Sequence, residues 1–256
     1  MTFAVVGALA QRSIRQTFRR PQFIAPILLM PTLFLAVNTG GAHSATRLPG
    51  FPAVDSLLDF ELAGAMMQSS MLAGVAGGIA LAIDIEIGFT DRLLAAPIPR
   101  PAIVLGRLGA TAAMGVLLAV WFLAIGLIFG ASVSAGVLGV LVILVLVPLA
   151  ALAFGSVGTA LALWAGRASV VQGIFPLVFV VVFMSSAFFP RALLSEPAHS
   201  IADYNPMSFI AEGVRDPIIG TVTATETLRG LLGIAIVGAI GAALSSLALR
   251  HRLRSS

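Results

Sequence analysis

Residues 137–163 read VLGVLVILVLVPLAALAFGSVGTALAL, a run without a single charged side chain. A helix needs about 20 apolar residues to cross the hydrocarbon core of a bilayer, so this run predicts a membrane-spanning helix. The whole chain has the same character, because 59% of its 256 residues are hydrophobic and only 10% are charged. With a mean hydropathy of +1.05, the sequence predicts an all-helical integral membrane protein.

Apolar runs on either side of this one predict six spans in total. They cover residues 23–37, 62–83, 103–129, 137–163, 171–189 and 228–249. Two prolines inside the first run, Pro26 and Pro31, should kink that helix. The connection at 131–136 is so short that it requires an antiparallel helical hairpin. The spans leave no room for a separate soluble catalytic domain, so residues 1–256 are expected to form a single transmembrane domain.

Residues 1–20 precede the first span and carry four of the arginines. On a helix, Arg12, Arg15 and Arg19 fall on one face and apolar side chains on the other, which is typical of a helix lying in the membrane interface. The alternative is a solvated helix that runs straight into the first span.

The orientation of the chain follows from the arginines. If the amino terminus is cytoplasmic, all of them lie on the cytoplasmic side except Arg47, Arg191, Arg215 and Arg229. Six spans then place both termini in the cytoplasm, and the chain is expected to be a multi-pass protein of the cytoplasmic membrane.

Several function classes are excluded by residues that the chain lacks. It has no cysteine, and all fifteen of its basic residues are arginine, so it has no P-loop lysine for ATP hydrolysis. The six cores carry essentially no ionisable residue, since Asp84 and Arg107 are expected to reach the interface from the span ends. Ion-coupled carriers and intramembrane hydrolases need such residues, and the three histidines lie in loops or the tail. No bound metal or cofactor is expected.

The connector at 84–101 is a candidate docking segment. Thr90 can cap a short helix over 91–96, which Pro97 would end. The helix would present Phe89, Leu93 and Leu94 beside charged residues, a surface suited to a soluble partner. An amphipathic loop resting on lipid headgroups is the alternative.

The external segment at 190–227 predicts short helices between the last two spans. Asn205 is an N-cap with Pro206 at the first helical position, and the helix over 207–215 should end at Asp216-Pro217. Glu212 and Arg215 are three residues apart and can pair. A pair of short helices re-entering the outer leaflet fits this pattern, and so does an exposed amphipathic loop.

The connector at 84–101 and the external segment at 190–227, in this order among six spans, resemble the ABC-2 family of ABC exporter permeases. The resemblance is strongest to drug and lipid permeases similar to the daunorubicin-resistance membrane subunits. The matching connector positions are Glu86, Gly88, Arg92, Leu93, Pro97, Arg100 and Arg107. The second match is Asn205-Pro206-Met207 followed by Glu212 and Arg215. Phe209 departs from the family, in which a polar residue or tyrosine is more usual at that place.

The resemblance implies a permease half-unit that pairs with a second permease copy or a paralogue, and with a separately encoded ATP-binding subunit that holds ATP and magnesium. The interfacial helix and the connector would contact that subunit. The residues expected to couple the two are Glu86, Gly88, Asp91, Arg92, Leu93, Pro97 and Arg100.

The resemblance also implies export of a hydrophobic or amphipathic substrate, such as a drug, polyketide or lipid. Its path would follow the interface between the two permeases and be lined by the second and fifth spans, with the re-entrant helices at the outer exit. The candidate path residues are Gln68, Ser69, Gly74, Gly78, Phe175, Phe179 and Phe183. Ordinary helix packing is the alternative for each of them. Membrane lipids are expected partners, and nucleic acid is not.

Two other functions stay open from the sequence. One is a non-catalytic assembly or immunity factor that only binds a partner through its cytoplasmic helix. The other is a membrane enzyme acting on lipid through the external groups His199, Asp203 and Glu212.

Overall fold

The computed structural model describes residues 2–95 and 100–255. Over these residues every regular element is a helix and there is no strand, so the all-helical prediction is confirmed. The long helices are α2 (Pro21–Gly41), α3 (Leu57–Glu86), α5 (Arg100–Ile128), α6 (Gly136–Ala165) and α11 (Ala224–Ser255). The shorter elements are α1 (Thr2–Phe18), η1 (His43–Arg47), α4 (Phe89–Ala95), α7 (Ala168–Gln172), α8 (Phe175–Phe183), η2 (Arg191–Leu193), α9 (Ala198–Tyr204) and α10 (Pro206–Ile219).

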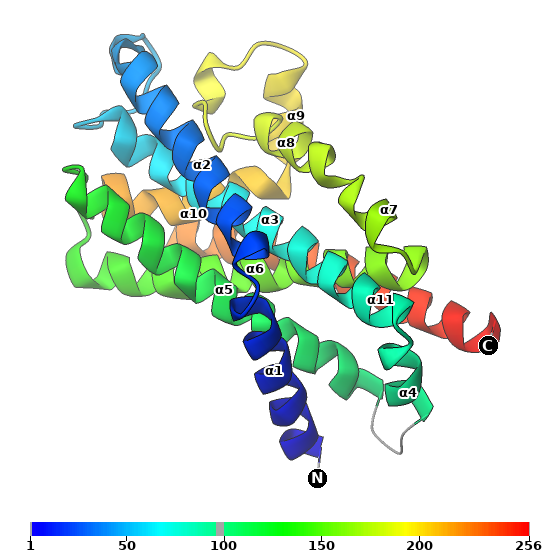
Figure 1. The fold of residues 1–256 in the computed structure, drawn as a ribbon. Helices are drawn as coiled ribbons and strands as arrows, with labels where there is room; N and C mark the ends of the chain where they lie inside the picture. Colours follow the sequence, from blue (N-terminus) through cyan, green and yellow to red (C-terminus); the bar gives the residue numbers. More distant parts are fainter. Residues whose placement is uncertain (1, 96–99, 256) are drawn as a thin grey trace.

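Among the described residues, five helices are long and apolar enough to cross a membrane. They are the five long helices, and each coincides with one of the predicted spans to within a few residues. The remaining predicted span, 171–189, is divided into α7 and α8 at Gly173, and neither piece is long enough to cross alone. Figure 1 shows α1 and α4 at one end of the molecule and α9 toward the other, with the long helices between them.

Helix α3 lies at the centre of the bundle and packs against α2, α5, α6 and α10. Its contact with α6 depends on small residues, because a Cβ atom at Gly74 would lie 2.6 Å from the carbonyl carbon of Phe154. A Cβ at Gly78 would lie 2.5 Å from the carbonyl oxygen of Gly158. The glycines therefore let the two backbones approach closely, as small residues do between membrane helices.

Helix α3 begins five residues before the predicted span because of a capping box. The Ser56 hydroxyl accepts a hydrogen bond from the backbone N–H of Asp59, and the Asp59 carboxylate accepts one from the Ser56 N–H. The longer helix includes Asp59 and Glu61, both buried. Both residues lie just before the predicted core at 62–83, which itself contains no ionisable side chain.

Two predicted helix ends also differ. Helix α10 passes Asp216-Pro217 and ends at Ile219, because its last carbonyls, those of Pro217 and Ile218, accept hydrogen bonds from Ala135 and Ser134 of the α5–α6 turn. Helix α4 begins at Phe89, so Thr90 lies inside it and is not its cap.

Candidate functional site

The cytoplasmic end predicted for the bundle contains a buried carboxylate, that of Asp84 in the last turns of α3. Its side chain is only 4% exposed and forms an ion pair with Arg107 of α5, with Nη2 2.8 Å from Oδ2. Two groups of α1 reach the same carboxylate, Arg12 at 3.2 Å and Gln16 at 3.4 Å. The prediction that Asp84 and Arg107 reach the interface is therefore wrong, because each satisfies the other's charge inside the protein.

Arg12 connects this cluster to the connector helix. Its guanidinium lies over the ring of Phe89 in α4, 3.7 Å from the ring centroid. Leu93 of α4 lines the same small crevice as Arg12 and Asp84. Helices α1, α3, α4 and α5 are thus joined through a few adjacent side chains.

The predicted coupling residues have different surroundings. Glu86 accepts a hydrogen bond from the backbone N–H of Ala168 at 2.9 Å, so it holds the start of α7. Gly88 has a φ of +68°, a left-handed conformation that glycine adopts without strain, and it makes the turn between α3 and α4. Arg92 is exposed, and its guanidinium donates to the Ile87 carbonyl at 3.4 Å. Pro97 and the side chains of Asp91 and Arg100 lie outside the described residues.

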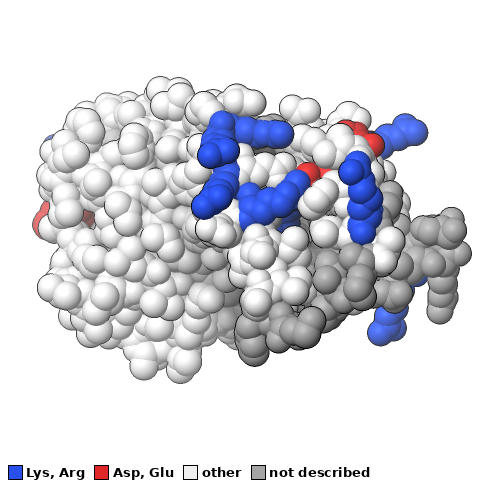
Figure 2. Space-filling model, turned by 60° about the horizontal axis from the view of Figure 1, so that its bottom comes forward, with Lys and Arg blue, Asp and Glu red and all other residues white. Residues whose placement is uncertain are grey.

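Arginine side chains gather on the surface of this end, around a few acidic ones, whereas much of the rest of the view is uncharged (Figure 2). The exposed arginines here are Arg15 of α1, Arg19 just after α1, Arg92 of α4 and Arg167. The distribution agrees with the predicted cytoplasmic face and suits an acidic protein or lipid surface.

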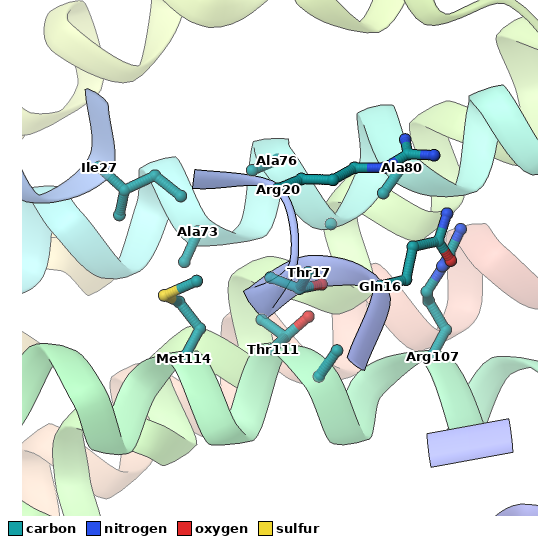
Figure 3. A pocket seen from close by; sticks show the side chains of 12 residues that line it. Gln16, Thr17, Arg20, Ile27, Ala73, Ala76, Ala80, Arg107, Thr111 and Met114 are labelled. Carbon is teal, nitrogen blue, oxygen red and sulfur yellow. The ribbon is translucent and has the colours of Figure 1, made fainter. Parts of the chain in front are cut away.

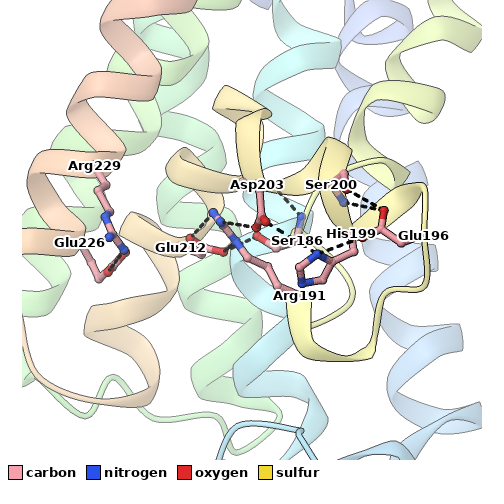
Figure 4. Close-up of polar contacts among 10 residues, drawn as sticks. Ser186, Arg191, Glu196, His199, Ser200, Asp203, Glu212, Glu226 and Arg229 are labelled. Carbon is pink, nitrogen blue, oxygen red and sulfur yellow. Dashed lines mark hydrogen bonds and ion pairs between the residues drawn. The ribbon is translucent and has the colours of Figure 1, made fainter.

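The predicted external end is organised by Arg191, which the sequence analysis had not singled out. Its Nε and Nη2 atoms donate to the two Glu212 carboxylate oxygens at 2.7 and 2.8 Å, and its Nη1 donates to Asp203 at 3.0 Å (Figure 4). Glu212 also accepts from the Ser186 hydroxyl at 2.6 Å. Partial burial alone would lower the pKa of Arg191, but Glu212 and Asp203 outweigh it and raise that pKa above its ordinary value.

The predicted pairing of Glu212 with Arg215 is therefore wrong. Arg215 is 5% exposed and points toward α3, where its Nε donates to the Phe60 carbonyl at 3.0 Å. It also donates to the carbonyl of Ala187 and lies over the Phe60 ring. Burial lowers the pKa of Arg215 to about 10, which still leaves it protonated at neutral pH.

Asn205 is an N-cap, as predicted, because its Oδ1 atom accepts from the Met207 N–H at 3.0 Å. Its amide also donates to the carbonyls of Val181 and Met184 at the end of α8. With Pro206 at the first position, one side chain thus starts α10 and satisfies free carbonyls of α8.

Next to these groups is an open hollow of about 360 Å³, a volume within the usual range for small-molecule sites. Arg191, Glu212, Arg215, Asp216 and Glu226 supply its charged lining. The alternative of a lipid enzyme acting through His199, Asp203 and Glu212 needs two free carboxylates, but both of them form ion pairs with Arg191. In the described part of the chain, no group of three or more His, Asp or Glu residues could hold a metal ion.

The candidate path residues do not share one surface. Gly74 and Gly78 contact α6, while Ser69 bonds to the Ala65 carbonyl of its own helix. Gln68 is fully buried, and among the described residues neither of its amide atoms has a hydrogen-bond partner.

The aromatic candidates face a different helix. Phe179 and Phe183 lie against Phe34 of α2, with ring centroids 5.9 and 6.1 Å apart. The side chain of Phe175 lies outside the described residues.

Comparison with known proteins gives a consistent result. The profile of a family described as "ABC-2 type transporter" matches residues 4–219. The chain is 28% identical over 205 residues to "Daunorubicin resistance ABC transporter permease protein DrrB1" of Streptomyces coeruleorubidus, covering 78% of this chain and 70% of the relative. It is 26% identical to the protein named "Putative transport permease ycf38" in Porphyra purpurea and in Pyropia yezoensis, covering 82% of this chain and 72% of each relative.

Proposed function

The chain belongs to the ABC-2 type transporter family, and from this premise we propose that it is the membrane subunit of an ATP-driven exporter. A separate ATP-binding subunit would hold ATP and magnesium. The family consists of transport permeases, so the chain itself is a membrane transport subunit and not the ATPase. The observation that carries the proposal is the family match across most of the chain.

The cytoplasmic cluster supplies a route for coupling. A subunit docked on α1 and α4 would move Arg12 and Phe89, and Arg12 is bonded to the carboxylate that joins α3 to α5. Movement of the docked helices would thereby reach two spans as a rigid-body displacement. The exposed arginines offer a complementary surface to an acidic partner.

We count α7 and α8 together as the fifth of six crossings, with a break at Gly173. Both termini then lie in the cytoplasm of a cell-membrane protein, and α9 and α10 re-enter the outer leaflet. The arginine distribution and the two short apolar helices support this topology. A second permease copy, or a paralogue, would complete the unit.

The substrate is proposed to be hydrophobic or amphipathic. A relative is named for daunorubicin resistance, and the cores of the spans are largely apolar. The path would run beside α3 and α8, and the hollow at Arg191 and Glu212 would lie at its outer end.

Affinity purification of the chain from its native membrane tests the proposal. Mass spectrometry of the eluate is expected to find an ATP-binding subunit in a fixed ratio, with vanadate-sensitive ATPase activity. Mock purification with an unrelated membrane protein of the same host is the control. A chain that purifies alone under mild detergent, without ATPase activity, would contradict the proposal.

A further inference from the structure

Two hollows at opposite ends of the bundle differ in what they can hold. The cavity between the α1–α2 turn, α3 and α5 has a volume of about 30 Å³, which is room for about one water molecule (Figure 3). The open hollow beside Arg191 and Glu212, at the predicted external end, has about 360 Å³ and can hold a small organic group. The charges that line this external hollow indicate what that group is.

The positive charge without a counter-ion in the external hollow is that of Arg215. This residue is 5% exposed, and its Nε and Nη2 atoms donate to the carbonyls of Phe60 and Ala187. No carboxylate in the described part of the chain forms an ion pair with it, and Glu61 and Glu212 attract it only from beyond ion-pair distance. A buried guanidinium that is satisfied by carbonyls alone keeps its full charge, so this wall favours an acidic group.

Another wall carries acceptors that lack donors. Asp216 accepts two hydrogen bonds from Thr223, at 2.7 and 2.8 Å, and no arginine or histidine among the described residues forms an ion pair with it. Glu226 pairs with Arg229 through Oε1, while its Oε2 atom is buried without a hydrogen-bond partner. A cationic N–H donor would satisfy that oxygen and balance the charge of Asp216.

The two kinds of charge lie apart. Arg215 and Asp216 are consecutive residues of α10, so their side chains leave the helix about 100° apart. Arg215 points toward α3, whereas Asp216 points toward the α10–α11 loop. Figure 4 shows Glu226 on α11, away from the pair formed by Arg191 and Glu212. The hollow therefore offers a positive wall and a negative wall to one ligand.

We propose that the external hollow binds a small zwitterion in which an acidic group and a primary ammonium are joined by a short linker, as in phosphoethanolamine. The acidic group would lie at Arg215, the ammonium at Asp216 and Glu226, and the linker against Pro52 and Ile219. A primary ammonium fits better than a quaternary one, because only the primary one has N–H donors for the unpartnered Glu226 oxygen.

Such a group can be the headgroup of phosphatidylethanolamine or a free molecule. The inference deepens the proposed function and rests on it in one respect, since the outer end of the export path was placed at this hollow. Binding can be measured on the chain without an ATP-binding subunit. A failure to bind would therefore leave the purification result unaffected, and a chain that purifies alone could still bind the zwitterion.

The test is a titration of the purified full chain with phosphatidylethanolamine, followed by native mass spectrometry. Phosphatidylcholine, which keeps the phosphate but has no N–H donor, and phosphatidylglycerol, which has no amine, are the matched lipids. Phosphatidylethanolamine should bind about tenfold more tightly than either, the effect of one hydrogen bond to a charged group. If either matched lipid binds as tightly, the proposal is overturned.

Soluble competitors distinguish the two sources and test both charges. Displacement of the lipid by free phosphoethanolamine would show that a free molecule can occupy the hollow, whereas selective lipid binding without such displacement would assign the hollow to the lipid. Ethanolamine and inorganic phosphate each carry only one of the two charges and should not displace the lipid. Displacement by either of them would contradict the requirement for both charges.

Four variants locate the site. Glu226→Gln and Asp216→Asn each remove a negative charge but keep an oxygen for the existing hydrogen bonds, and each should weaken phosphatidylethanolamine binding about tenfold. Glu196→Gln and Asp55→Asn are the matched controls, because both acids are exposed and neither lines the hollow. The controls should bind like the unaltered chain. Equal losses in a variant and its control would overturn the assignment to this hollow.

Discussion

The Asp84 carboxylate accepts hydrogen bonds from two guanidinium groups and an amide that come from two other helices. Such a group is costly to bury alone, and its stability depends on every partner being present. Because Arg107 is 7% exposed in its side chain, it depends on Asp84 in the same way.

Asp84→Asn should destabilise the protein by about 3 kcal/mol, since it leaves the Arg107 charge buried without its counter-ion. The measurement is the thermal unfolding midpoint of the purified chain in detergent. Asp55→Asn, at an exposed position, serves as the control and should change little. The double variant Asp84→Asn/Arg107→Gln should recover part of the loss, and a loss equal to the sum of the single variants would contradict this account.

Contacts between residues close together in the sequence could be predicted from it, whereas ion pairs between residues far apart in the sequence could not. The Asn205 cap depends on groups two residues apart, so it could be predicted. The partner of Glu212 could not, because Arg191 lies 21 residues away and only the fold brings it nearer than Arg215. Asp84 and Arg107 lie near the ends of the second and third predicted spans, on either side of one connector, a signal that could have suggested the pair.

At the scale of elements, every long helix was predicted, because an unbroken run of apolar residues long enough to cross a bilayer is visible in the sequence itself. The residues at which helices end were predicted less accurately than the helices themselves. Hydrogen bonds from the α5–α6 turn carry α10 past Pro217, and these come from residues more than 80 positions away. The break between α7 and α8 coincides with Gly173, which a hydropathy average does not detect.

The crossing of α3 and α6 can be tested with one methyl group. Gly78→Ala should lower the thermal unfolding midpoint, because its Cβ would lie 2.5 Å from a backbone oxygen that cannot move independently. Gly77→Ala is the matched control, since its Cβ meets only the Thr111 hydroxyl at 3.1 Å and a side chain can adjust. If both variants unfold at the same temperature, the close backbone contact is not present in the membrane.

The proposed crossing by α7 and α8 can be measured directly, because the chain contains no cysteine. Ser169→Cys and Ser195→Cys introduce single thiols at two exposed positions, one in the first turn of α7 and one beyond the end of α8. In intact cells a membrane-impermeant maleimide should label residue 195 and spare residue 169, with labelling of permeabilised cells as the control. Labelling of both, or of neither, in intact cells would exclude the crossing.

On the scale of the whole molecule, α1 and the connector helix α4 meet the bundle at the same end, through Arg12. In the complete transporter, Arg92→Ala should reduce the amount of substrate exported per ATP hydrolysed while membrane insertion stays normal, because the docking surface alone is altered. Glu86→Ala should do the same and also loosen α7, which Glu86 holds at Ala168. Transport and ATPase activity are measured on the same proteoliposomes.

Arg229→Ala is the control for both substitutions, since it removes an exposed arginine from the opposite end of the bundle. Its ratio of transport to hydrolysis should equal that of the unaltered protein. An unchanged ratio in both Arg92→Ala and Glu86→Ala would place the subunit contact elsewhere.

The two arginines that are buried in the described part of the chain, Arg107 and Arg215, need different kinds of partner. Arg215 donates to main-chain carbonyls, and every amino acid at position 187 offers the same oxygen. As the sequence diverges among descendants, residue 187 is limited by space alone, and Arg215 can persist beside many different neighbours. Arg107 needs a carboxylate, so positions 84 and 107 should change together or not at all. A lineage that replaces one of them is expected to carry a compensating replacement at the other.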